Sequence, residues 1–415
     1  MIQNILLVPT SIRDDDLKGH LPALLNANKA FHLLYVLEQS FCSEVLSTLT
    51  ESCVYIDFKW LIDQHHEYHQ FLDTLQVQIP SLTHCDHVDL KRQILKLLEE
   101  DGLEVTTDLH LLKQYSTQHH LYMQLYQLIK KQNFYKQWVM KLQPYKTEDS
   151  KRLRLHGTWR SSTSYTGRIT ASKVNLTALP NAMKPYIVPS SQASTIWSVD
   201  FNNAELRCVA YLSQDKQLLD DLTNDIDVHS VIGSMIGMVI NQAIPNNDLR
   251  KTAKTFIFAM LYGAGDTTLC NILVKNGVCA TVYDVKRLKQ FIYERYNFLK
   301  TYFEQTVKRE WVDTFYGPIY PLVPMSEPQK KNFAFQSMIA SALKLLAITC
   351  VRQNLEVINL IHDEVWVQVP NSNEALWQEQ LKKQFTKIIL KEHPSFPING
   401  FLKVDKLEDK YNAQQ

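Results

Sequence analysis

The chain has 415 residues, of which 45% are hydrophobic and 21% charged, and its formal net charge at pH 7 is +1. This length suits one unit of several subdomains, or two to three domains, with ample apolar content for a core. The near-neutral charge speaks against a uniformly basic nucleic-acid-binding protein, so any contact with nucleic acid must come from local patches. The seven cysteines include no CxxC pair, which speaks against a zinc site or a disulfide framework.

The N-terminal part carries no targeting signal that the sequence reveals. Residues 1–40 begin with a short apolar stretch that ends at Pro9, and the acidic run at residues 14–16 is typical of a solvated turn. The sequence contains no run of 18 apolar residues. We therefore expect a cytoplasmic protein without a membrane partner.

The next part of the chain is expected to be helical. Residues 88–142 have the apolar periodicity of successive helices. Between residues 128 and 154, basic side chains that include Lys130 and Lys131 outnumber acidic ones and alternate with aromatic residues. Such a strip can follow the phosphates of a nucleic acid, although a solvated charged helix gives the same pattern.

Two aspartates follow apolar, strand-like runs in distant parts of the chain. Asp200 follows residues 196–199, and Asp363 follows residues 357–361 and precedes the alternating run Val365, Val367, Val369. The polar triplet at residues 362–364 therefore fits the tip of a hairpin. A single aspartate at a strand end is more often a turn residue, but a hairpin tip can project carboxylates into a cleft.

Between these aspartates lies a basic and aromatic helix. Arg250, Lys254, Phe258 and Tyr262 recur every four residues and so share one helix face, with a start signal at residues 245–248. The basic residues lie near the helix N-terminus, where the macrodipole favours a polyphosphate. The gradient from basic to aromatic suits a nucleoside triphosphate lying along the helix, and an ordinary amphipathic helix is the alternative.

Together these features predict metal-dependent nucleotidyl transfer. Two metal ions in such a site need at least two carboxylates, for which Asp200 and Asp363 are the candidates. Mg²⁺ uses one or two protein carboxylates together with water and substrate phosphate, so no His or Cys cluster is required.

The three segments, residues 198–207, 250–263 and 358–369, resemble motifs A, B and C of the family A DNA polymerases, the bacterial DNA polymerase I type. Residues 165–180, 227–229, 293–303 and 332–336 are similar to further family segments in the same order. The resemblance implies a mainly helical α+β fold shaped as a right hand, with a thumb, a palm that has a small antiparallel sheet, and helical fingers.

The resemblance also implies roles for individual residues. Asp200, Asp363 and the backbone carbonyl of Phe201 would bind two Mg²⁺ ions, with Mn²⁺ as a substitute, and Glu364 would lie close by in the catalytic set. Lys254 would also protonate pyrophosphate, and Glu205 would exclude the ribose 2′-hydroxyl. The dNTP-binding residues would be Arg250, Lys254, Phe258, Tyr262, His229 and Glu205. The DNA-binding residues would be Arg168, Asn175, Asn332, Gln336, His362, Lys130 and Lys131.

The resemblance also implies how the chain is divided into the parts of a right-hand polymerase. Residues 1–40 are an extension of unknown role, 41–160 the lead-in and thumb, 161–210 the first part of the palm, 211–310 the fingers, and 311–415 the second part of the palm with the C-terminal segment. A proofreading nuclease would need roughly 150 further residues, so none is expected.

We therefore expect a monomeric DNA-directed DNA polymerase that binds primer-template DNA and dNTPs and does not proofread. Two alternatives stay open. One is a catalytically silent relative that only binds primer-template, and the other is a polymerase that copies RNA. The sequence leaves open the host, any accessory partner, and the choice between replication, repair and lesion bypass.

Overall fold

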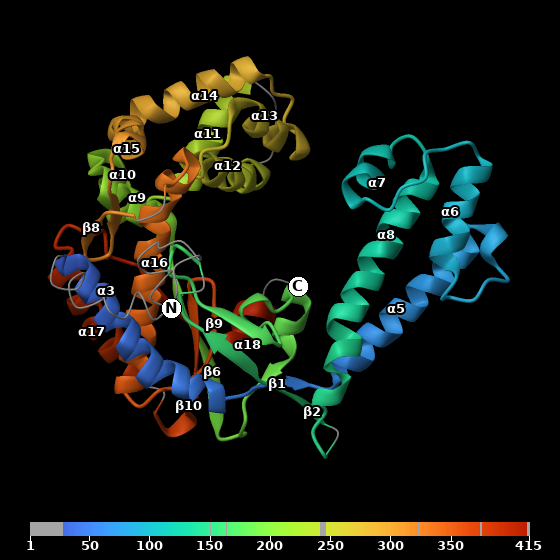
Figure 1. The fold of residues 1–415 in the computed structure, drawn as a ribbon, viewed down its shortest axis with the longest axis horizontal. Coiled ribbons are helices and arrows are strands. Elements are labelled where there is room, and N and C mark those ends of the chain that lie inside the picture. Colours follow the sequence, from blue (N-terminus) through green and yellow to red (C-terminus); the bar gives the residue numbers. More distant parts are fainter. Residues whose placement is uncertain are drawn as a thin grey trace. The chain divides into compact units, whose positions relative to one another are not determined.

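The protein is described by a computed structural model that covers residues 28–149, 151–162, 164–240, 246–321, 324–373 and 376–412. These residues form two compact units (Figure 1). The larger unit comprises Met1–Cys53, His156–Leu179 and Ser191–Gln415, and the smaller unit comprises Val54–Leu155 and Pro180–Ser190. The acidic run at residues 14–16 and Pro245 lie outside the described residues.

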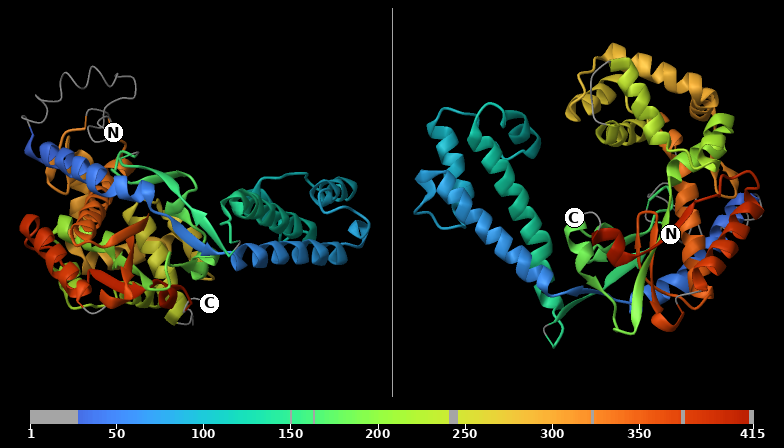
Figure 2. Two further views of the ribbon diagram at one scale, coloured as in Figure 1. Left: turned by 90° about the horizontal axis from the view of Figure 1, so that it is seen from below. Right: turned by 180° about the vertical axis from the view of Figure 1, so that it is seen from behind.

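The smaller unit combines a short antiparallel sheet with a helical bundle (Figures 1 and 2). Its strands, in the order β2-β1-β5, are β2 (Arg152–Leu155), β1 (Val54–Asp57) and β5 (Ile187–Val188). In α6, Leu90, Ile94 and Leu98 recur every four residues and are fully buried, as an amphipathic helix requires. The helices are α5 (Lys59–Gln78), α6 (Leu90–Glu100), α7 (Leu109–Tyr115) and α8 (His120–Phe134). A π-helical segment at Tyr135–Met140 continues α8, and short 3₁₀ helices lie at Pro80–Leu82, Gln143–Tyr145 and Asn181–Tyr186. The successive helices predicted over residues 88–142 are confirmed.

The larger unit is built around a four-stranded antiparallel sheet. Its strand order is β11-β6-β10-β9, with β11 (Leu402–Lys406), β6 (Ser194–Phe201), β10 (Glu364–Pro370) and β9 (Glu356–Ile361). The strands β9 and β10 form the predicted hairpin, with only His362 and Asp363 between them. Asp200 on the central strand β6 is paired in register with Glu364 on β10 and with Lys403 on β11. Three distant segments thus meet at one end of this sheet.

A long apolar helix, α16 (Glu327–Arg352), packs against this sheet (Figure 1). By length and composition it could cross a membrane, but 78% of its most apolar window is buried inside the protein. Leu346, Ala347 and Cys350 are among its residues with no exposed surface. The helix is therefore a core helix of the larger unit.

The remaining helices of the larger unit complete a mainly helical α+β fold. A group of helices between residues 204 and 308 precedes α16 in the chain (Figures 1 and 2). This group consists of α9 (Ala204–Ser213), α10 (Lys216–Thr223), α11 (Val228–Ile240), α12 (Asn246–Leu261), α13 (Asp266–Lys275), α14 (Val282–Arg295) and α15 (Asn297–Lys308). Near the C-terminus, α17 packs against α16, and its Trp377 and Phe385 rings contact Trp197 and Phe201 of β6. The other elements are α3 (Lys29–Ser40), η1 (Phe41–Leu46), α4 (Ser47–Glu51), β3 (Gly157–Arg160), β4 (Thr170–Lys173), η5 (Leu176–Ala178), β7 (Val312–Thr314), β8 (Gly317–Ile319), η7 (Asn371–Asn373), α17 (Trp377–Glu392) and α18 (Leu407–Asn412). The predicted fold class is confirmed.

Candidate active site

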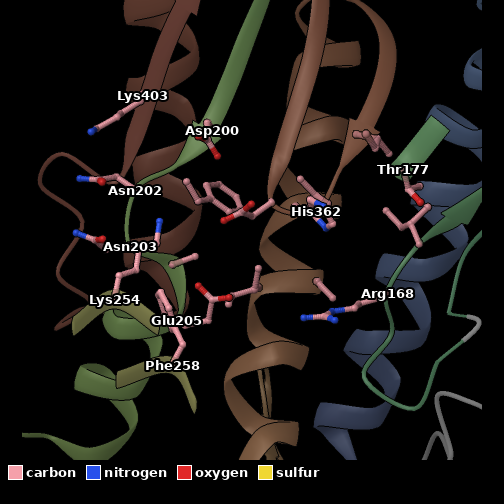
Figure 3. A pocket seen from close by; sticks show the side chains of 18 of the residues that line it. Arg168, Thr177, Asp200, Asn202, Asn203, Glu205, Lys254, Phe258, His362 and Lys403 are labelled. Atoms are coloured by element: carbon pink, nitrogen blue, oxygen red, sulfur yellow. The ribbon is translucent and has the colours of Figure 1, made fainter. Parts of the chain in front are cut away.

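A cavity of about 770 Å³ opens at the end of the larger unit's sheet. Figure 3 shows side chains from several separate segments converging on it, including Arg168, Glu205, Lys254 and His362. Its lining also includes most of the residues that the sequence singled out between positions 200 and 258. The lining includes Arg168, Thr177, Ala178, Asp200, Phe201, Glu205, His229, Arg250, Lys254, Phe258, His362, Asp363 and Lys403.

The sheet brings Asp200 and Asp363 to one wall of the cavity. Asp200 is the penultimate residue of β6, and Asp363 lies in the turn between β9 and β10. The backbone N–H of Phe201 donates to the carbonyl oxygen of Asp363 at 3.3 Å, which ties the turn to the end of β6. His362 has a φ of +52°, a left-handed conformation that turns the chain tightly within the hairpin.

The carboxylates of this wall repel one another. Burial, together with the negative charges of Asp200, Glu205 and Glu364, raises the pKa of Asp363 to about 7. Burial also raises the pKa of Asp200, an effect that the ammonium of Lys410 opposes. Buried carboxylates that share a site in this way favour a bound cation, because a cation removes the cost of charging them together.

The donor set fits Mg²⁺. Among the described residues, no group of three or more His, Cys, Asp or Glu side chains is placed to hold a metal ion. A site with two cavity-lining aspartates is what a substrate-completed Mg²⁺ site needs, because water and substrate phosphate fill the other positions. The residues present thus fit the metal that the sequence predicted.

Glu364 has surroundings different from those of the two aspartates. It is 6% exposed and is not among the residues that line the cavity. Its Oε1 accepts hydrogen bonds from the Ser198 hydroxyl at 2.5 Å and the Trp366 indole N–H at 2.7 Å. Its Oε2 accepts from the Tyr411 hydroxyl at 3.1 Å. Both oxygens are therefore already engaged within the protein.

Two lysines near the C-terminus also reach this wall. Lys403 on β11 lines the cavity, and Lys410 on α18 lies 2.9 Å from Asp200 Oδ2 and 3.2 Å from Glu364 Oε1. Sequence reasoning missed both residues. They come close only because β11 pairs with β6, about 200 positions earlier in the chain, and no local motif reports such a pairing.

The helix α12 forms the opposite wall. Arg250, Lys254 and Phe258 all line the cavity, as the four-residue spacing predicted for one helix face (Figure 3 labels Lys254 and Phe258). Arg250 Nε donates to Asp227 Oδ2 at 2.5 Å across an exposed ion pair. Lys254 is exposed. The wall therefore presents positive charge opposite the carboxylates.

His229 on α11 is buried against this wall. Its ring lies 5.6 Å from that of Phe258, and burial lowers its pKa to about 4. Neither ring nitrogen has a hydrogen-bond partner among the described residues, although His229 is only 2% exposed and lines the cavity. A buried donor and acceptor without partners is costly, and a ligand in the cavity would satisfy them.

Glu205 reaches the cavity from the first turn of α9 (Figure 3). Asn203, the residue before α9, has a φ of +53°, and this left-handed turn lets α9 begin directly after the end of β6. Glu205 therefore lies between the two walls, close enough to Asp363 for its charge to raise the pKa of that aspartate.

Arg168 enters the cavity from the loop that follows β3. Burial raises the pKa of Tyr262, and hydrogen bonds with Arg168 and Gln336 oppose part of this rise. Tyr262 and Gln336 do not line the cavity themselves. Asn332 Nδ2 donates to the backbone oxygen of Tyr262 at 3.4 Å. The three residues predicted to contact substrate or DNA thus form a connected group beside Arg168.

A buried network supports the loop that carries Arg168. Glu38 and Lys344 form an ion pair, with side chains 6% and 2% exposed. Glu38 also accepts hydrogen bonds from Ser161 at 2.5 Å and from Ser162 at 2.7 Å. Ser162 has a φ of +49°, so these bonds hold a tight turn just before the loop. Helix α3, helix α16 and the loop are fixed together.

The other predicted DNA contacts lie outside the cavity lining. Asn175 is exposed and accepts a hydrogen bond from Thr177 at 2.7 Å, while Thr177 and the following Ala178 line the cavity. Lys130 and Lys131 lie on α8 of the smaller unit. Lys131 pairs with Glu67 at 2.7 Å, and Lys130 lies over the ring of Tyr126.

Comparison with known proteins shows the family. The model of DNA polymerase family A matches residues 64–399. DNA polymerase I of Borreliella burgdorferi is 24% identical over 395 residues, which cover 86% of this chain and 42% of the relative. DNA polymerase I of Lactococcus lactis subsp. lactis is 30% identical over 260 residues, which cover 56% of this chain and 28% of the relative. The chain thus spans less than half the length of the curated relatives it matches.

The fold matches a solved polymerase domain. The POL domain of Pol1 from M. smegmatis, solved in complex with DNA primer-template and dNTP, superposes with a TM-score of 0.75 at 18% identity. The match covers 95% of this chain and 74% of that one. With the family model matched over most of its length, the chain belongs to the family A DNA polymerases.

Proposed function

We propose that this chain is a DNA-directed DNA polymerase that adds dNMP to the 3′-hydroxyl of a primer and releases pyrophosphate. The observation that carries the proposal is the cavity itself. One wall presents two partly buried carboxylates and the other presents a lysine and an arginine, and this is the charge pattern that nucleotidyl transfer requires.

In this proposal Asp200, Asp363 and the carbonyl oxygen of Phe201 would hold two Mg²⁺ ions, for which Mn²⁺ could substitute. When bound, the ions neutralise charge on the reacting oxygens and phosphate. Asp200 and Asp363 lie at the end of a paired sheet, so their backbone positions are fixed before substrate arrives. The protein's main contribution is therefore positioning.

The α12 wall binds the triphosphate in this proposal. Arg250 and Lys254 attract the phosphates, and Lys254 gives a proton to the leaving pyrophosphate. His229 is neutral at pH 7, because its pKa is about 4, and so it can donate one hydrogen bond to a phosphate oxygen without adding charge. Phe258 and Tyr262 contact the sugar and the nascent base pair.

Selection of the sugar is assigned to Glu205, which extends between the two walls of the cavity. A bulky carboxylate beside the sugar leaves no space for a 2′-hydroxyl. Ribonucleotides would clash with it, so deoxynucleotides are preferred. We assign contacts with primer-template DNA to Arg168, Asn175, Asn332, Gln336 and His362, and backbone contacts to Lys130 and Lys131 of the smaller unit. The smaller unit is proposed as the thumb, the sheet of the larger unit as the palm, and residues 211–310 as the fingers.

Primer extension tests the proposal. A labelled primer on a DNA template is incubated with Mg²⁺ and dNTPs, using wild type, Asp200→Ala and Asp363→Ala. Extension by the wild type that is lost in both variants, while both stay folded, supports the proposal. A folded wild type that binds primer-template but never extends it would instead identify a silent binding protein. Extension on an RNA template with no extension on DNA would also contradict the proposal.

A further inference from the structure

Lys410 occupies an unusual place beside the candidate metal ligands. Its ammonium donates to Asp200 Oδ2 at 2.9 Å and to the Ser198 hydroxyl at 2.9 Å. It also lies 3.2 Å from Glu364 Oε1, and its side chain is only 17% exposed. An ammonium has three donors, so these three contacts use its full hydrogen-bonding capacity.

Lys410 contacts Asp200 without itself lining the cavity. Asp200 and Asp363 line the cavity, but Lys410, Ser198 and Glu364 are not among its lining residues in the described chain. Lys410 therefore approaches Asp200 from the side of the sheet and of α18. The contact holds one oxygen of Asp200, Oδ2.

The short helix α18 is itself well anchored, which fixes Lys410. Leu407 and Tyr411 are buried, and α18 packs against β6 and β11. Tyr411, the next residue, donates its hydroxyl to Glu364 Oε2 at 3.1 Å. Two consecutive side chains of α18 thus hold the two acidic residues that face each other in register on β6 and β10.

We propose that Lys410 is a positioning residue that restrains one oxygen of Asp200 and, by its charge, weakens the binding of divalent cations to the cavity carboxylates. The proposal rests on the function proposed above, because it assumes that Asp200 is a metal ligand. A fixed positive charge beside Asp200 offsets part of the attraction for a metal, and it also limits the orientations that the carboxylate can adopt. In this proposal Lys410 therefore keeps the metal affinity moderate and the Asp200 carboxylate in a defined orientation.

The test measures Mn²⁺ binding directly, by electron paramagnetic resonance of free Mn²⁺, without DNA or dNTP. The variants are Lys410→Met, which removes charge and donors, Lys410→Gln, which keeps a donor without charge, and Lys410→Arg, which keeps the charge. Lys391→Met on the exposed face of α17 is the matched control. Circular dichroism establishes that each variant is folded.

We expect Lys410→Met and Lys410→Gln to bind Mn²⁺ about tenfold more tightly than wild type, the order expected when one positive charge is removed near a divalent ion in a water-exposed cavity. Lys410→Arg and Lys391→Met should bind within about threefold of wild type. In primer extension, Lys410→Met should need less Mg²⁺ for half-maximal rate and have a lower kcat, and Lys410→Arg should restore part of that kcat. A purely structural role would weaken metal binding and activity together.

The proposal is overturned if folded Lys410→Met or Lys410→Gln binds Mn²⁺ as wild type does or more weakly. If Lys410→Met does not fold, Lys410→Gln decides the question by the same measurement. If neither neutral variant folds while Lys410→Arg does, Lys410 is a structural residue and the proposal fails. A further outcome is that the wild type never extends a primer while the neutral variants still bind Mn²⁺ more tightly than it does. That result would sustain the role of Lys410 and refute only the polymerase function.

Discussion

Replacing Asp363 by asparagine should make the metal-free protein more stable at pH 8 while abolishing nucleotide addition. Asp363 is partly buried beside Asp200, Glu205 and Glu364, and its pKa is raised from an ordinary 3.8 to about 7. The folded protein therefore binds this proton more tightly than the unfolded chain does. The stabilisation that results is complete below about pH 4 and is lost as the pH rises through 7.

The size of the effect follows from the difference of about 3 units between the raised pKa of Asp363 and its ordinary value. At about 1.36 kcal/mol per unit, charging Asp363 costs the folded state about 4 kcal/mol at pH 8. The side chain lines an open cavity, so solvent screening reduces the expected cost to about 2 kcal/mol. Asparagine carries no charge, so Asp363→Asn should exceed wild type in free energy of unfolding by about that amount.

The assay is urea unfolding in EDTA at pH 5, 6, 7 and 8, with Asp405→Asn as control. Asp405 lies exposed on β11 of the same sheet, and its replacement should change stability by less than about 0.5 kcal/mol. The advantage of Asp363→Asn should shrink as the pH falls toward 5, where wild-type Asp363 is protonated. Equal stability of Asp363→Asn and wild type at pH 8, or an advantage independent of pH, would refute the reasoning.

Three further variants test other parts of the account. Glu205→Ala should raise the relative efficiency of rNTP over dNTP addition by roughly 100-fold, because the clash with the 2′-hydroxyl is removed; unchanged selectivity in single-nucleotide addition would argue against the gate. Lys254→Met should lower kcat by about 100-fold or more through loss of proton donation, and a change confined to KM would limit Lys254 to binding. Glu38→Gln should destabilise the protein by about 3 kcal/mol in urea unfolding, because it leaves Lys344 buried without its partner charge; a cost below about 1 kcal/mol would show that the network is dispensable.

The sequence predicted those features that depend on local pattern. The helix face of Arg250, Lys254 and Phe258 follows from a four-residue spacing, and all three residues line the cavity. The hairpin tip at Asp363 follows from two apolar runs interrupted by polar residues, and the structure has it. The fold class follows from the family resemblance, which the family model and the fold match bear out.

Features that depend on distant pairing were beyond sequence reasoning. The order β11-β6-β10-β9 places the C-terminal strand beside Asp200, and this brings Lys403 and Lys410 to the carboxylates. Glu38 and Lys344 are 306 positions apart, and neither lies in a pattern that marks it as a buried ion pair. Glu364 follows Asp363 directly, yet its position at the start of β10 directs it to Ser198 and Trp366.

The most direct measurement of the central claim is single-turnover nucleotide addition on four primer-templates that differ only in the first template base. Each is mixed with each dNTP in Mg²⁺, and the product is resolved as primer plus one nucleotide. The account predicts rapid addition of the complementary dNTP on every template, and its loss in EDTA and in Asp200→Ala. Addition that ignores the template base, or that survives removal of the metal or of Asp200, would contradict it.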